Sequence, residues 1–157
     1  MKKIVALVMC LTMLCSMCTA FAQSSDVFTP TFLLQQYMTM EECYATAENR
    51  ELLVALAVYD LALQEVDAEH LKKAIKNNDV YVCKRSETVL SIMFFADGKG
   101  INLLYMPDGM IAMIETFKTQ LSAKKSVQKL KDHGLLMSFE QVDGKKVNER
   151  MNDLFAE

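Results

Sequence analysis

Glycine and proline are scarce in this chain, and tryptophan is absent. Its 157 residues include five Gly and two Pro. This composition excludes a collagen-like repeat and a Pro/Gly-rich linker. A hydrophobic fraction of 52% and a charged fraction of 24% exclude a disordered tail. The length corresponds to one domain, and a domain of this size buries a sufficient core without a metal or disulfide staple.

The common catalytic motifs are also missing. The sequence contains no G-x-S-x-G nucleophile elbow, no phosphate-binding G-x-x-x-x-G-K, no zinc-protease H-E-x-x-H and no EF-hand spacing. The one G-x-G, Gly98 to Gly100, joins two predicted strands, whereas a dinucleotide loop joins a strand to a helix. We therefore expect no cofactor and no metal bound by His, Cys, Asp or Glu, and the sequence leans away from an enzyme.

The first 22 residues have the layout of a cleaved signal peptide. Lys2 and Lys3 give a basic start, an apolar stretch runs from Ile4 to Cys18, and Ala20-Phe21-Ala22 is a small-x-small cleavage pattern. The layout resembles the Sec signals of Gram-negative bacteria. It predicts cleavage after Ala22, a secreted or periplasmic protein, and a single domain over residues 23–157 without a membrane span.

An uncleaved anchor over residues 4–22 is the alternative. Its 19 residues fall just short of the roughly 20 that span a bilayer. Thr12, Ser16 and Thr19 weaken it further.

Removal of the leader makes the protein more acidic. The whole chain has 17 basic and 20 acidic residues, and loss of Lys2 and Lys3 leaves 15 against 20. We expect no nucleic-acid binding through overall charge. Five lysines nevertheless cluster in one segment, where they form either a solvated surface or a patch for an acidic partner: Lys118, Lys124, Lys125, Lys129 and Lys131.

Three of the five cysteines lie in the predicted leader, so its C-x-x-C, Cys15 to Cys18, is discarded with it. Cys43 and Cys83 remain. An oxidising compartment allows a disulfide between them. The alternative is two separately buried thiols, because spacing alone does not place the two Cα atoms within bridging distance.

The amino-terminal half has helical patterns. Thr29-Pro30 predicts the start of a helix whose apolar face continues through Leu33, Tyr37, Met40, Tyr44 and Ala47. Residues 52–59 are apolar all round and predict a buried helix, and Asp60 interrupts the apolar run too soon for a membrane span. Asp67 is a predicted N-cap for a helix over residues 68–77.

Strand patterns follow. Residues 80–83, 88–96 and 101–106 are rich in β-branched and aromatic residues, and Pro107-Asp108-Gly109 predicts a tight turn. Met110 to Phe117 fits either a returning strand or a helix, and the turn chemistry favours the strand. A helix from Ser122 to His133, a strand within 135–142 and a short terminal helix complete the chain.

The fold class is therefore α+β: a helical N-terminal half packed on an antiparallel β-meander, followed by a helix, a strand and a short C-terminal helix. Within residues 89–96 both alternating sets of side chains are largely apolar. Both faces of the sheet must then be covered. We expect the N-terminal helices on one face and the Ser122 to His133 helix on the other; a homodimer interface or an apolar ligand cavity is the alternative.

Three functional hypotheses remain. We favour an exported, non-enzymatic binding or protein-interaction module whose partner is a protein or a small apolar ligand. The second is a hydrolase with an atypical site around His70, which lies beside Glu69.

The third is a Met-based Cu(I)-binding protein. Eight of the twelve methionines lie outside the leader, including Met38, Met40, Met110 and Met113, and Met106 faces Met110 across the predicted turn. Thioethers are soft ligands suited to Cu(I), but methionine also fills hydrophobic cores.

Overall fold

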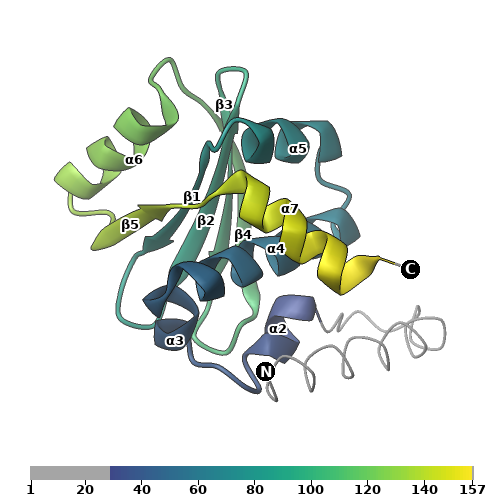
Figure 1. Cartoon of the computed structure of the whole chain (residues 1–157). Coiled ribbons are helices and arrows are strands. Elements are labelled where there is room, and N and C mark those ends of the chain that lie inside the picture. The colour runs from purple at the N-terminus through teal and green to yellow at the C-terminus, as the bar shows by residue number, and fades with distance from the viewer. Residues whose placement is uncertain (1–28, 157) are drawn as a thin grey trace.

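The computed structural model describes residues 29–156, so the predicted signal peptide lies outside the described residues. These residues form an α+β fold in which helices lie on both sides of a five-stranded antiparallel sheet (Figure 1). The predicted fold class is confirmed. The described helices are α2 (Pro30–Leu34), α3 (Met40–Ala45), α4 (Ala47–Leu63), α5 (Ala68–Lys76), α6 (Ala123–Asp132) and α7 (Gly144–Phe155).

The prediction of one helix from Thr29 through Ala47 is wrong, because this segment forms α2, α3 and the start of α4. Thr39 and Thr46 each begin a new helix, since their side chains accept hydrogen bonds from backbone N–H groups three residues ahead. Thr39 and Glu42 form a reciprocal capping box. Asp60 interrupts the apolar run but not the helix: α4 continues to Leu63 and buries that carboxylate.

The strands are β1 (Val80–Lys84), β2 (Leu90–Ala96), β3 (Lys99–Tyr105), β4 (Ile111–Lys118) and β5 (Ser138–Gln141). Their order in the sheet is β4-β3-β2-β1-β5, so β4 and β5 are the two edges. Residues 111–118 are a strand, as the turn chemistry before them indicated. The strand pairs with β3 through an irregular register, discussed below.

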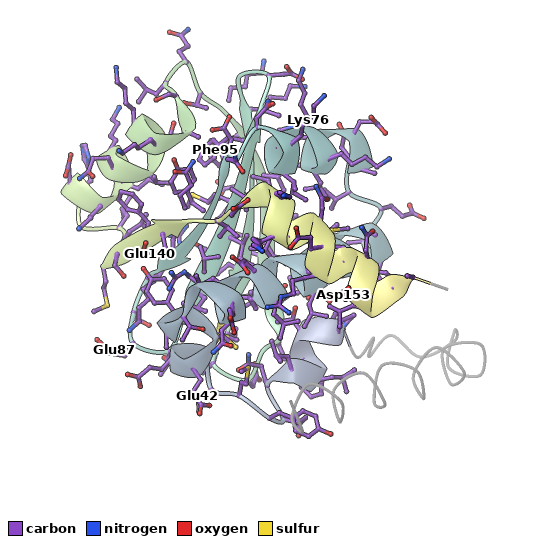
Figure 2. The ribbon with its side chains drawn as sticks, viewed as in Figure 1. Glu42, Lys76, Glu87, Phe95, Glu140 and Asp153 are labelled. Carbon is purple, nitrogen blue, oxygen red and sulfur yellow. The ribbon has the colours of Figure 1, made fainter. Side chains whose placement is uncertain are left out.

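The sheet separates two apolar clusters. Helices α4, α5 and α7 lie on one side of the sheet and α6 lies on the other (Figure 1). On the first side, Ile92 and Phe94 of β2 are buried beneath these helices. On the second side, Phe95 (labelled in Figure 2) is buried with Tyr81 and with Val127 of α6. All seven residues of β2 are buried, as the two-sided apolar pattern of this segment predicted.

A close approach joins α7 to the end of α5. Asp143 caps α7, and the N–H of Gly144 donates a hydrogen bond of 2.8 Å to Oδ1 of Asn78. A Cβ atom at position 144 would overlap the carbonyl oxygen of Ile75. The contact between these two helices therefore depends on the absence of a side chain at this position.

Candidate functional site

A groove of about 320 Å³ lies between the end of β4 and α6. Its walls combine apolar side chains with a few basic and hydroxyl groups. The lining residues are Phe117, Lys118, Thr119, Leu121, Ser126, Lys129, Leu130, His133 and Leu135.

Capping interactions at the two ends of α6 build the groove. Ser122 begins the helix by accepting a hydrogen bond from the N–H of Lys125. Gly134, with φ of 74°, ends the helix in the left-handed conformation. The N–H of Leu135 then donates a hydrogen bond of 2.9 Å to the carbonyl of Leu130. This turn holds Leu135 beside the last turn of the helix.

Hydroxyl groups tie the loop before α6 to the helix. Thr119 and Ser126 share a hydrogen bond of 3.0 Å between their side-chain oxygens. The N–H of Thr119 also donates to the carbonyl of Gly98, at 2.9 Å, which fixes the end of β4 against the neighbouring hairpin. The wall of the groove is therefore attached to the sheet at the end where α6 begins.

Phe117 supplies the aromatic part of the lining. Its ring lies over Gly100 of the adjacent strand, where a Cβ atom would collide with it. It also packs edge-to-face against Phe95, with ring centroids 5.8 Å apart. Leu121 and Leu135 are 43% and 52% exposed, so the groove presents apolar surface to solvent.

The groove is basic in a protein whose overall charge is negative. Lys118, Lys129 and His133 line it, and no acidic residue is among its described lining residues. The carbonyl of Lys129 accepts a hydrogen bond of 2.7 Å from Nδ1 of His133, which fixes the orientation of the imidazole. Basic and apolar residues therefore line the same groove.

The lysine cluster of the sequence is divided by the structure. Lys118 and Lys129 line the groove, whereas Lys124 and Lys125 lie elsewhere on α6. Lys131 lies over the ring of Phe139, with Nζ 5.9 Å from the centroid. Leu121 and Leu135 were missed, although Gly134 followed by a leucine is the signal for the turn that places Leu135.

His70 is nearly buried, and one nitrogen of its ring is held by the backbone. Its Nε2 donates a hydrogen bond of 2.9 Å to the carbonyl oxygen of Phe94, and the residue is 8% exposed. A hollow of about 550 Å³ adjoins it. The lining residues are Asp67, Glu69, His70, Lys72, Lys73, Lys76, Asp97 and Lys99. None of these has a hydroxyl or thiol, so the described lining offers His70 no Ser, Thr or Cys nucleophile.

Asp60 lies in a different place, inside the first cluster. Its Oδ2 accepts a hydrogen bond of 2.7 Å from the hydroxyl of Tyr105, which also shares a hydrogen bond of 3.0 Å with Thr31 Oγ1. The N–H of Thr31 donates to Oδ1 at 3.4 Å. Burial raises the pKa of Asp60 to about 6, although these hydrogen bonds oppose the shift.

The two cysteines are free thiols on opposite sides of the sheet. Cys43 is buried in the first cluster and Cys83 in the second. Burial raises the pKa of Cys43 to about 11 and that of Cys83 to about 12. Both thiols are therefore protonated at neutral pH and shielded from reagents.

We expect neither cysteine to react with iodoacetamide in the native protein. After denaturation without a reductant both should be alkylated, because no disulfide protects them. Mass spectrometry of the peptides that contain Cys43 and Cys83 measures this directly. Alkylation that requires prior reduction would instead show that the two are oxidised.

Among the described residues, no group of three or more His, Cys, Asp or Glu side chains could hold a metal ion. None of the helices in the described part of the chain is long and apolar enough to cross a membrane. No protein-family model, no curated protein and no solved structure matches this chain.

Proposed function

We propose that this chain is an exported binding protein whose groove between β4 and α6 holds a small apolar ligand carrying a negative charge. The composition of the groove carries the proposal: leucine and phenylalanine side chains lie beside Lys118, Lys129 and His133, with no carboxylate in the described lining. Apolar walls with a few convergent polar groups are typical of ligand sites. Export rests on the predicted leader.

Binding is favoured over catalysis by the positions of the reactive groups. The described lining beside His70 contains no Ser, Thr or Cys nucleophile, and Asp60 is buried with Tyr105 and Thr31. The two thiols are buried and protonated. None of these groups lines the groove.

The size of the groove limits the ligand. A volume of about 320 Å³ lies at the lower end of the range of roughly 300–1,000 Å³ for small-molecule sites. The groove therefore suits an aromatic acid or a single short acyl chain with one anionic head group. A protein partner would reach the same surface only through an acidic side chain next to an apolar one.

Anilinonaphthalene sulfonate, an apolar fluorescent anion, should bind in this groove. Its neutral analogue N-phenyl-1-naphthylamine lacks only the sulfonate, and we expect it to bind more weakly because it forgoes the attraction to Lys118 and Lys129. Added salt should reduce the affinity for the anion and leave that for the neutral probe unchanged. Fluorescence titration of the folded protein measures both affinities.

Substitution of Leu135 with serine should weaken binding of the anionic probe about fivefold, the result of losing about 1 kcal/mol of apolar contact. Lys129→Glu should weaken binding of the anion and spare the neutral probe. Leu63→Ser is the matched control, because Leu63 is 48% exposed and does not line the groove. Equal probe affinity in all three variants would contradict the proposal.

A further inference from the structure

Three methionines at the β3–β4 hairpin are exposed, which is unusual for so apolar a side chain. Met106 and Met110 are each 44% exposed and Met113 is 40% exposed. By contrast, Met40 and Met93 are buried in the two clusters, at 3% and 1%. The three hairpin methionines, here called the thioether patch, are therefore not used to fill the core.

The turn places two members of the patch directly opposite each other. The N–H of Met106 donates a hydrogen bond of 2.9 Å to the carbonyl of Met110, and the N–H of Gly109 donates one of 3.0 Å to the carbonyl of Met106. Residues opposite each other in an antiparallel pair have Cβ atoms about 4.5–5.5 Å apart. Methionine has three rotatable side-chain bonds, so two thioethers can converge over this distance.

A β-bulge brings the third methionine to the same face. Tyr105 pairs with Ile111 but Leu104 pairs with Met113, so Ala112 is an extra residue in β4. Ile111 and Ile114 both pack against the first cluster, although they are three residues apart. Met113 therefore faces the opposite side.

Strand alternation turns Met106 and Met110 to that opposite side as well, because their neighbours Tyr105 and Ile111 face the first cluster. Contacts with the helical side of the fold hold the end of the hairpin in place. The hydroxyl of Tyr105 is bonded to Asp60, and Gly109 lies so close to Gln35 that a Cβ atom there would collide with that side chain. The backbone that carries the patch is thus fixed.

We infer that the thioether patch is a binding site for a soft monovalent metal ion, Cu(I). Neutral sulfur ligands select Cu(I) over hard divalent cations. A thioether carries no proton to lose, so the site should bind Cu(I) with the same affinity at pH 5 and pH 7, unlike a thiolate or imidazole site. The patch shares no residue with the groove of the proposed function, so failure of either proposal would leave the other unaffected.

The thiols that could compete for a soft ion among the described residues are those of the two cysteines. Both are buried with raised pKa values, and they lie in clusters on opposite sides of the sheet. Neither offers a thiolate to an ion that arrives from solvent. Met137 is 49% exposed and lies next to β5, the opposite edge of the sheet from β4, so it serves as a control thioether.

The test is a titration of residues 23–157, the chain expected after cleavage of the leader, labelled with 13C at the methionine ε-methyl groups, with Ag(I) as a redox-stable stand-in for Cu(I). At one equivalent, the resonances of Met106, Met110 and Met113 should shift together and that of Met137 should not. Each single Met→Leu change supplies the assignment and keeps the apolar volume. Three unshifted patch resonances would overturn the inference.

Uptake of Cu(I) itself is measured under reducing conditions against a chromophoric Cu(I) chelator. The variant with Met106→Leu, Met110→Leu and Met113→Leu should bind one equivalent fewer than the wild type, and Met137→Leu should bind the same number. The triple variant should keep the cooperative urea unfolding transition of the wild type, which shows that it is folded. Equal Cu(I) uptake by the wild type and a folded triple variant would overturn the inference.

Discussion

Alanine at position 144 is expected to destabilise the protein by about 3 kcal/mol, the upper end of the usual range for overpacking. Gly144 has no positive φ, and a first-turn helix position normally accepts alanine without strain. Here the added Cβ would overlap the carbonyl oxygen of Ile75, and backbone cannot move aside as a side chain can. The helices α5 and α7 must then separate, which also breaks the hydrogen bond from Gly144 to Asn78.

Gly134→Ala is the control for this substitution. Gly134 has φ of 74°, but no atom lies within 4 Å of the position that a Cβ would take. Only backbone strain opposes alanine there, at a cost of about 1 kcal/mol. Urea denaturation of both variants tests the contrast. Equal destabilisation by the two alanines would show that α7 does not sit against α5 as described.

Asp60→Asn is expected to stabilise the protein at pH 8 by about 3 kcal/mol and to have little effect at pH 4. The pKa of Asp60 is about 6 in the folded protein, against an ordinary value of 3.8, so the folded state binds the proton more tightly than the unfolded state. Stability from this group is therefore present below about pH 4 and is lost as the pH rises to about 6. Two pKa units correspond to about 3 kcal/mol.

Asparagine can keep every hydrogen bond of the buried network. Its Nδ2 can donate to the hydroxyl of Tyr105, which then donates to Thr31 Oγ1, while Oδ1 still accepts from the N–H of Thr31. The experiment is urea denaturation of the wild type and the Asp60→Asn variant from pH 4 to pH 8. The difference between their free energies of unfolding isolates the effect of this carboxyl from that of other titrating groups. If the difference in free energy of unfolding does not grow between pH 4 and pH 6, Asp60 is not a buried group that ionises in this range.

Local patterns in the sequence predicted most of the elements. Asp67 and Ser122 were predicted to begin α5 and α6, and both do so because each side chain accepts hydrogen bonds from backbone N–H groups of the first turn. The continuous apolar face from Leu33 to Ala47 was misleading. The spacing of apolar residues can stay helical across two short helices when both pack on the same core. The overlooked signals were Thr39 and Thr46, which are the N-caps of α3 and α4.

The two proposed binding surfaces depend on tertiary geometry that no local pattern contains. The lysines of residues 118–131 were noticed, but which of them line a groove depends on where α6 crosses the sheet. The methionines near the Pro107-Gly109 turn were noticed too. Their common face results from one unpaired residue, Ala112, and a bulge is set by the pairing of two strands.

The division of the core by the sheet has a consequence for motion. Helix α6 is held by the second cluster, whereas the other helices share the first, and no buried residue belongs to both. The free energy needed to lift α6 is therefore separate from that of global unfolding. Backbone amides of α6 should exchange with solvent through local opening while the rest of the fold stays intact.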